Sequence, residues 1–272
     1  MIPVISIAIS KGGVGKTTTA VNLAAEFGLH GYKVLLIDTD EQGNATFSAT
    51  GKTKEEFEQK GIFNMLKAFN ILPPSNFISP TLIPNTDIIP ANSHTAQALH
   101  QLPILQSEYK FPECVYLSMC ISQVKEDYDV VIIDTPPAKN TLTQSALYAS
   151  DHVIIPVKAD KYCIDSLFET LALINTVEKN TDTKINLLGI LLSMVEKTAL
   201  TRVVEESLLA CEYGEDVLPV EIRKTQAVNE STAAGKPVVI YNKRCNATED
   251  YRALYNTVVK KLKMKPDKGG KK

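Results

Sequence analysis

The sequence has no apolar run long enough to cross a bilayer, and its first apolar stretch is broken by Pro3 and lacks a basic leader. Its five cysteines contain no Cys-x-x-Cys pair and no Cys/His ligand cluster, and their odd number argues against a disulfide framework. Internal repeats and low-complexity linkers are also absent. We therefore expect a cytoplasmic protein with reduced thiols and no domain boundary inside its main body.

The formal net charge of −2 hides a basic C-terminal end. Residues 260–272 hold seven lysines and one aspartate, a local charge of +6, which leaves −8 on the other 259 residues. Pro266, Gly269 and Gly270 disfavour a helix there. The sequence predicts one domain over residues 1–263 and a disordered basic tail over 264–272, which either aids solubility or contacts nucleic acid.

Short apolar runs alternate with helical patterns along the chain. Strands are predicted at residues 4–9, 33–37, 87–89, 130–133, 152–157, 185–192 and 217–222. Helices are predicted at residues 16–27, 93–102, 115–125, 141–149, 164–178, 201–211 and 248–262. Residues 49–84 are the least regular part and are expected to form an insertion or a small lid region. The alternation predicts an α/β fold with a mostly parallel, doubly wound sheet flanked by helices.

A phosphate-binding loop follows the first predicted strand, at residues 10–18, and a helix opens directly behind it. Glycines let consecutive backbone N–H groups turn toward phosphate oxygens, and the helix N-terminus adds its positive dipole end. Lys16 is expected to reach the β- and γ-phosphates, and Thr17 to supply a hydroxyl to Mg²⁺. The loop departs from G-x-x-x-x-G-K-[ST] in having Ser10 at the first glycine, and it carries a second lysine, Lys11.

Acidic residues end two of the predicted strands. Asp134 would bring a carboxylate to the carboxyl edge of the sheet, where doubly wound folds bind ligands, and we expect it to hold Mg²⁺ through water. Asp38 and Asp40 end the strand after the phosphate-loop helix, and their spacing points both the same way if the strand continues. For either of them the alternative is a helix cap or turn residue.

These motifs together resemble the deviant Walker A ATPases of the ParA/MinD group. The loop matches K-G-G-x-G-K-[ST] at every position, and residues 38–46 match D-x-D-P-Q-G-N-A-T except that Glu41 replaces the proline. Residues 130–137 are similar to the family's Walker B and switch II segment. The C-terminal part is similar more loosely, through Leu218-Pro219 and residues 230–237.

The resemblance implies roles for particular residues. Lys11 would reach across a nucleotide-sandwich homodimer to the partner's phosphates, Asp40 would position the attacking water, and Asp38 would lie near the metal. The implied catalytic residues are Lys11, Lys16 and Asp40, and the implied metal residues are Thr17, Asp38 and Asp134. The implied nucleotide-binding residues are Lys11, Gly12, Gly13, Val14, Gly15, Lys16, Thr17 and Thr18, with Met194 and Pro219 at the adenine.

ATP is favoured over GTP because residues 242–245 lack the aspartate of the guanine-selecting N-K-x-D motif. The cofactors expected are therefore ATP and Mg²⁺. Met194 could equally be a core residue.

Three functions compete. In a ParA/Soj-like partition ATPase, associated with the nucleoid, an ATP-bound homodimer binds non-specific double-stranded DNA, and a ParB-like centromere-binding adaptor stimulates hydrolysis. The basic candidates for DNA contact are Arg202, Arg223, Lys224, Lys236, Lys243 and Arg244, although L-P-V-E-I-R replaces the family's I-P-R-N-x-R. A MinD-like membrane-cycling ATPase would need residues 250–263 as an amphipathic anchor, whereas their spacing also suits packing on the domain. A nitrogenase-iron-protein-like reductase would need cluster cysteines, which this chain does not place in similar loops.

Overall fold

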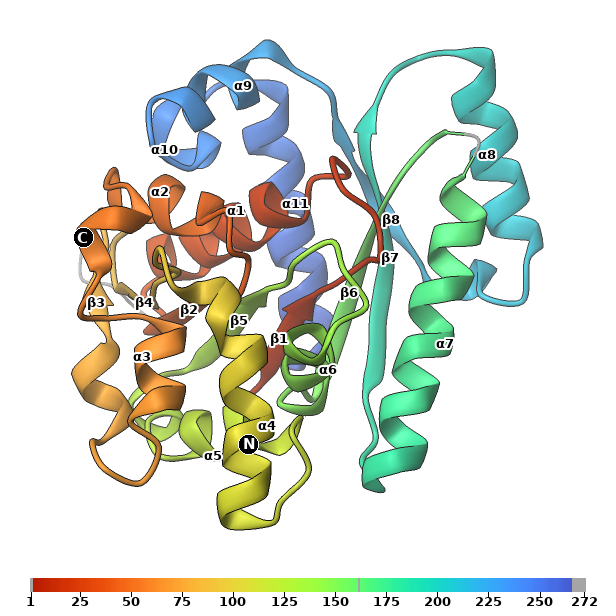
Figure 1. The fold of residues 1–272 in the computed structure, drawn as a ribbon. Helices are drawn as coiled ribbons and strands as arrows, with labels where there is room; N and C mark the ends of the chain where they lie inside the picture. Colours follow the sequence, from red (N-terminus) through yellow and green to blue (C-terminus); the bar gives the residue numbers. More distant parts are fainter. Residues whose placement is uncertain (1, 161, 266–272) are drawn as a thin grey trace.

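A central eight-stranded sheet organises the computed structural model, which describes residues 2–160 and 162–265 (Figure 1). The strand order is β3-β4-β2-β5-β1-β6-β7-β8, and all neighbours are parallel except β3 and β4. The strands are β1 (Val4–Ile7), β2 (Val34–Asp38), β3 (Ser79–Pro80), β4 (Thr86–Ile89), β5 (Val130–Asp134), β6 (His152–Lys158), β7 (Asn186–Val195) and β8 (Val217–Arg223). The predicted doubly wound α/β class is confirmed.

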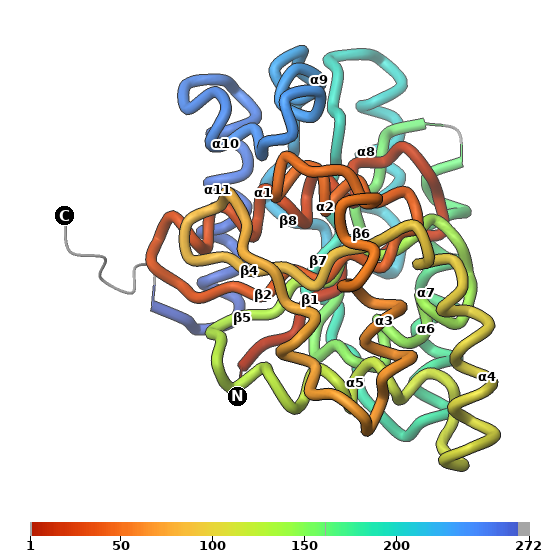
Figure 2. The backbone as a smooth tube through the Cα atoms, turned by 60° about the vertical axis from the view of Figure 1, so that its left-hand side comes forward, coloured from red at the N-terminus to blue at the C-terminus, as the bar shows by residue number. Residues whose placement is uncertain are grey.

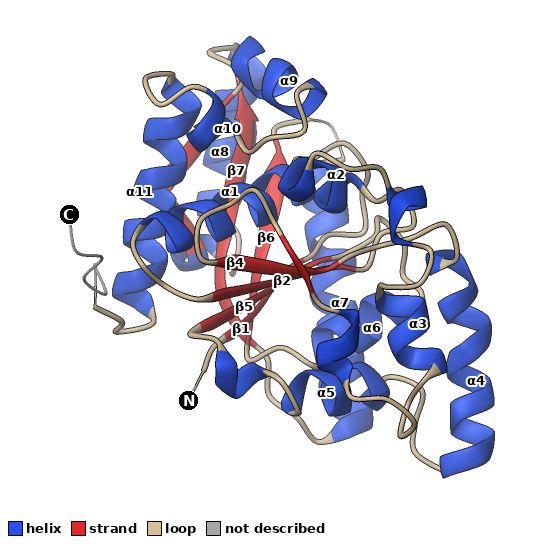
Figure 3. Ribbon diagram, turned by 90° about the vertical axis from the view of Figure 1, so that its left-hand side faces the viewer, coloured by secondary structure: helices blue, strands red, loops and turns tan. Residues whose placement is uncertain are grey.

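Helices cover both faces of this sheet (Figure 3). One face packs against α1 (Lys16–Leu29), α2 (Asn44–Thr50), α9 (Gln226–Ala233), α10 (Val238–Tyr241) and α11 (Asn246–Lys261). The other face packs against α3 (Ile62–Lys67), α4 (Ala98–Tyr109), α5 (Val115–Ser122), α6 (Thr141–Tyr148), α7 (Cys163–Thr181) and α8 (Ala199–Ala210). Successive strand residues point to opposite faces. Leu36 therefore lies in the core on the face covered by α1, the first core, and Leu35 lies in the core on the face covered by α3, the second core. Burial on both faces explains why these strands are apolar throughout.

The strand order places the phosphate loop at a reversal point of the sheet. The loop leaves β1, whose two neighbours are β5 and β6, and enters α1. Asp38 and Asp134 are partners in the β2–β5 register, so both carboxylates emerge at the carboxyl edge. Open α/β sheets bind ligands in the crevice at such a point. Figure 2 shows α9 and α10 close together on the side of the molecule where α1 begins.

The segment at residues 49–84 differs from its expected irregular or lid-like form. It contains the end of α2, the short helices η1 (Lys54–Phe57) and η2 (Pro74–Phe77), α3 and β3. Ile62, Met65 and Phe77 are buried in the second core. The segment is therefore an integral part of the sheet and of the helix layers on both of its faces.

The C-terminal helix and the start of the predicted tail pack against the domain. The apolar residues of α11, namely Tyr251, Leu254, Tyr255, Val258 and Val259, are all buried in the first core. Met264 packs against the same core, and the Tyr32 hydroxyl donates to the carbonyl oxygen of Lys265. Residues 266–272 of the predicted tail lie outside the described residues. Within the described part, no helix is long and apolar enough to cross a membrane.

Candidate nucleotide site

Two glycines give the phosphate loop its shape. Gly13 and Gly15 have φ angles of 70° and 84°, in the left-handed region that side chains rarely adopt. At Gly15 the nearest neighbour of an added Cβ would be Ser193, at 3.9 Å, so conformation and not crowding requires glycine there. Gly15 is also the N-cap of the 14-residue helix α1, and no side chain caps that helix end. The first-turn N–H groups of α1 thus have no side-chain cap and can meet an anion.

Lys16 is a buried cation at the mouth of α1. The residue is only 6% exposed, and its ammonium donates to the carbonyl oxygen of Lys11 at 2.6 Å. Burial lowers the pKa of Lys16, while the nearby carboxylates of Asp134 and Asp40 oppose that shift. A phosphate oxygen would add the anionic partner that this ammonium lacks.

Asp134 is the carboxylate that the site leaves without a donor. It is fully buried, and no described residue donates to either of its oxygens with full hydrogen-bond geometry. Burial raises the pKa of Asp134 well above its usual range, and Asp38 adds to the rise, whereas the Thr17 hydroxyl and Lys16 oppose it. A buried carboxylate without donors beside a hydroxyl is a suitable pair of oxygen ligands for Mg²⁺.

Asp38, by contrast, has both carboxylate oxygens occupied. One oxygen accepts from the Thr46 N–H at 2.8 Å and the Thr46 hydroxyl at 2.7 Å, and the other accepts from the Asp40 N–H at 3.1 Å. Burial raises the pKa of Asp38 to about 6 even though these donors oppose the rise. The bonds tie the end of β2 to α2, as the turn-residue alternative expected. The described residues contain no cluster of three His, Cys, Asp or Glu side chains able to hold a metal ion.

Asp40 lies at the turn between β2 and α2. It is 7% exposed, and its carboxylate accepts from the Gln42 N–H at 3.0 Å. Its charge acts on Lys16 by raising that lysine's pKa, so the two side chains face the same site. The placement agrees with a residue that orients a group near the phosphates.

Lys11 is engaged inside its own chain. Its ammonium lies 2.5 and 2.7 Å from the two carboxylate oxygens of Asp160, and 5.8 Å from the centre of the Tyr162 ring. Partial burial acts to raise the pKa of Asp160, but bonds from Lys11 and the Tyr162 N–H outweigh it and lower that pKa. Sequence reasoning missed Asp160, because no motif marks the residues after β6.

A cavity of about 260 Å³ opens beside the phosphate loop. The residues that line it are Gly13, Gly15 and Thr18, Ser193 and Met194 near the end of β7, residues 222–225, part of α9, and Tyr251. Met194, predicted at the adenine, lines this cavity with a φ of 54°. Pro219 does not line it: β8 continues four residues beyond Pro219, which is exposed, so the later residues reach the site. No motif in the sequence marks Tyr251 or residues 222–225 as part of a cavity wall.

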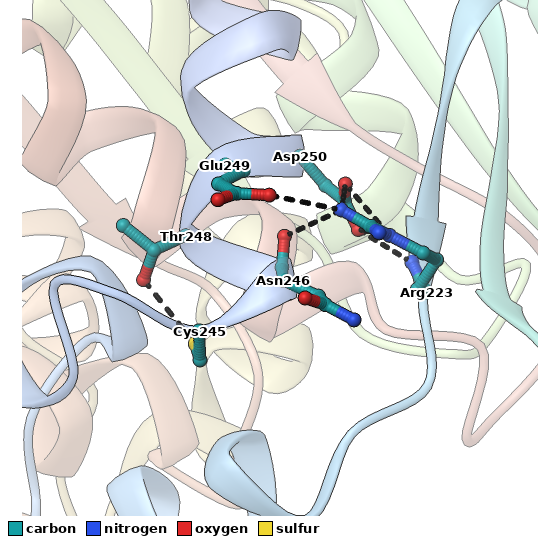
Figure 4. A network of polar contacts seen from close by, with 6 residues as sticks. All are labelled: Arg223, Cys245, Asn246, Thr248, Glu249 and Asp250. Atoms are coloured by element: carbon teal, nitrogen blue, oxygen red, sulfur yellow. Dashed lines mark hydrogen bonds and ion pairs between the residues drawn. The ribbon is translucent and has the colours of Figure 1, made fainter.

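The six basic candidates for DNA contact do not form one surface. Arg223 is bound to Asp250, and Lys224 lies 3.1 Å from Glu196 (Figure 4 shows Arg223). Lys236 lines a smaller cavity of about 190 Å³ with Thr17 and other residues, so it faces the phosphate side. The other three are exposed and make no ion pair among the described residues: Arg202 on α8, and Lys243 and Arg244 between α10 and α11. Figure 1 places α8 far from α10, across the molecule.

Known proteins are similar to this chain over nearly its whole length. A family model described as an AAA domain matches residues 2–187. The sporulation initiation inhibitor protein Soj of Bacillus subtilis is 35% identical over 258 residues, covering 94% of this chain and 97% of that protein. The chain belongs to the Soj/ParA family of P-loop ATPases.

Other members and neighbours agree with this assignment. The chromosome-partitioning ATPase Soj of Thermus thermophilus is 31% identical, covering 95% of this chain and 96% of that protein. Cobyrinic acid a,c-diamide synthase from Mycobacterium smegmatis, solved with bound ADP and magnesium, has a TM-score of 0.78 at 27% identity, covering 97% and 96% of the two chains. The Soj/ParA chain is thus an ATPase by family, and its sheet is shared with a metabolic enzyme.

Proposed function

We propose that this chain is a DNA partition ATPase: its ATP-bound homodimer binds non-specific DNA and hydrolyses ATP when a DNA-bound, ParB-like adaptor stimulates it. The observation that carries the ATPase chemistry is the buried carboxylate of Asp134, to which no described residue donates with full hydrogen-bond geometry, near the buried ammonium of Lys16. The partition role rests on Soj relatives at 35% and 31% identity, against 27% for the cobyrinic acid enzyme. The cargo would be a plasmid or a chromosome.

The site fits ATP with Mg²⁺. Thr17 and Asp134 would hold the ion, Asp134 through water. Asp38 would hold α2 in place through its bonds to Thr46. Bound there, Mg²⁺ supplies charge neutralisation at the β- and γ-phosphates. The cavity lined by Met194 would receive the base, while residues 12–18 wrap the phosphates.

Hydrolysis in this site would depend on placement more than on covalent help. Lys16 neutralises phosphate charge in its own subunit. Asp40 holds the attacking water in line with the bond that breaks. Lys11, once it leaves Asp160, adds a cation at the partner subunit's phosphates, much as an arginine finger does.

The membrane alternative is disfavoured by the packing of α11. A membrane anchor needs a bulky apolar face free to enter the lipid. On α11 the apolar residues, Tyr251 and Leu254 among them, are buried in the first core. The exposed positions of this helix include Arg252, Lys260 and Lys261, which suit a polyanion.

The test measures binding to non-specific duplex DNA and to anionic liposomes side by side, with ATP, with ADP and without nucleotide. We expect DNA binding that needs ATP and falls steeply with salt, because released counterions drive it. A Lys243→Ala, Arg244→Ala variant should lose much of the ATP-dependent binding, while the matched change Arg202→Ala on α8 should have little effect. Truncation after Lys265 should weaken binding and keep its ATP response. DNA binding that is equal in ATP and ADP, or liposome binding that needs ATP, would refute the proposal.

A further inference from the structure

Arg223 lies at the rim of the cavity proposed for the base and is held there by a network of polar contacts (Figure 4). Its Nε lies 3.0 Å from each carboxylate oxygen of Asp250, and its Nη2 lies 2.5 Å from Oδ1 of the same residue. The backbone N–H of Arg223 also donates to Asp250, at 2.9 Å. One carboxylate thus fixes both the side chain and the main chain of the last residue of β8.

The network extends to the first turn of α11. Nη2 of Arg223 donates to the carbonyl oxygen of Asn246 at 3.2 Å and lies 3.5 Å from Glu249. Asp250 is only 8% exposed, so its charge depends on the guanidinium for compensation. Figure 4 shows the guanidinium pointing from β8 toward the first turn of α11.

One end of this clamp belongs to the wall of the cavity. Arg223 lines the cavity together with Lys224 and Thr225, and Asp250 does not line it, but the next residue, Tyr251, does. The sheet also holds the main chain of this wall: Arg223 pairs with Val195 in the register of β7 and β8, and the Lys224 N–H donates to the Val195 carbonyl oxygen at 3.0 Å. The bonds between Arg223 and Asp250 add a direct tie from this wall to α11.

We propose that Arg223 is a positioning residue for the nucleotide base: clamped by Asp250, it holds the 222–225 segment against α11 and so shapes the cavity that receives the base. The inference rests on the proposed function, because it assumes that this cavity receives ATP. It differs from the expectation that Arg223 contacts DNA, since Nε and Nη2 of the guanidinium are bonded inside the chain. Binding of the phosphates, which rest on residues 12–18, does not depend on the clamp.

The experiment compares two ligands on the full-length protein with Mg²⁺: ATP, and inorganic tripolyphosphate, which has no base. Arg223→Lys keeps the positive charge and loses the bidentate contact with Asp250. Asp250→Asn keeps a hydrogen-bond acceptor and loses the negative charge. The matched control is Glu249→Gln, because the Glu249 side chain is 65% exposed and touches the same guanidinium only at 3.5 Å. Circular dichroism checks that each variant is folded, and calorimetric titration gives each Kd.

We expect the Kd for ATP to rise about tenfold in both clamp variants, and the Kd for tripolyphosphate to change by less than about twofold. The control should match the wild type for both ligands. Equal weakening of both ligands, or an unchanged Kd for ATP, would overturn the clamp. If the Asp250→Asn variant binds DNA more tightly at saturating ATP and its affinity for ATP is unchanged, Arg223 contacts DNA and does not position the base. A wild-type protein that binds no ATP would refute the proposed function itself.

Discussion

Lys11 and Asp160 form a two-point ion pair within one chain, with the ammonium 2.5 and 2.7 Å from the carboxylate oxygens. Their side chains are 23% and 30% exposed, so the pair lies at the rim of the phosphate loop and not in the core. A lysine that serves a partner's phosphates would have to exchange Asp160 for another anion. The pair therefore competes with the proposed dimer.

Breaking this pair should favour the dimer. Asp160→Asn keeps an acceptor for the Tyr162 N–H, which donates to Asp160 at 3.0 Å, but releases the charge of Lys11. Each subunit of the dimer would break one such pair, and a partly exposed pair is worth roughly 1 kcal/mol or less. We therefore expect ATP-dependent dimerisation at an up to about 30-fold lower protein concentration. Sedimentation velocity measures this. Glu169→Gln breaks the exposed pair with Lys139 and serves as the control. A dimer weakened by Asp160→Asn would contradict the competition.

Removing the buried lysine of the loop should abolish nucleotide chemistry without unfolding the protein. Lys16→Ala deletes a cation whose burial already lowers its pKa, so the loss of its bond to the Lys11 carbonyl is partly offset by relief of the burial cost. We expect no measurable ATP binding or hydrolysis and a change in unfolding free energy of about 1 kcal/mol or less. Lys67→Ala on α3 is the matched lysine control. Normal turnover in Lys16→Ala would disprove the phosphate role.

Asp40→Ala should separate binding from hydrolysis. Among the described residues the carboxylate of Asp40 accepts only from the nearby Gln42 N–H, so its loss leaves the phosphate loop in place. We expect ATP to bind and to support a lasting dimer, while hydrolysis falls by at least ~100-fold through loss of water positioning. Single-turnover hydrolysis and nucleotide titration distinguish the two steps. Failure to bind ATP would instead make Asp40 a structural residue.

The paired carboxylates at the sheet edge should make the nucleotide-free protein sensitive to pH. Burial raises the pKa of Asp134 well above its usual range and that of Asp38 to about 6. Because the unfolded chain ionises at lower pH than the folded one, stability is lost as pH rises through the folded pKa. Asp134→Asn, which mimics the protonated form, should therefore raise the unfolding free energy by roughly 1–3 kcal/mol at pH 8 and by less at pH 5.

Thermal and urea unfolding of the nucleotide-free protein at these two pH values measure the effect. Asp127→Asn, an exposed carboxylate, is the control. Equal stabilisation at both pH values would mean that the charge of Asp134 is not its cause.

Local sequence patterns predicted the parallel strands and the longer helices because each pattern reflects an element's own period and burial, whereas the two-residue strand β3 was missed. The short helices at residues 44–67 and 226–241 were missed. They span only one or two turns, too few for a periodic apolar face to appear, and their ends depend on contacts made elsewhere. The hydrogen bonds from Thr46 to Asp38 are such a contact, since the acceptor lies on β2 and the donors lie on α2.

The sequence by itself determined the phosphate loop, with Lys16 and Thr17, and the acidic strand ends at Asp38 and Asp134. These features depend on glycine conformations and on the order of strand, loop and helix, which neighbouring residues set. Only the tertiary structure decided which charges meet. Lys11 pairs with Asp160, which lies 149 positions away in the sequence, and Arg223 pairs with Asp250, which lies 27 positions away. An ion pair depends on which strand ends and helix turns lie side by side, and that is a property of the packed sheet and its helices.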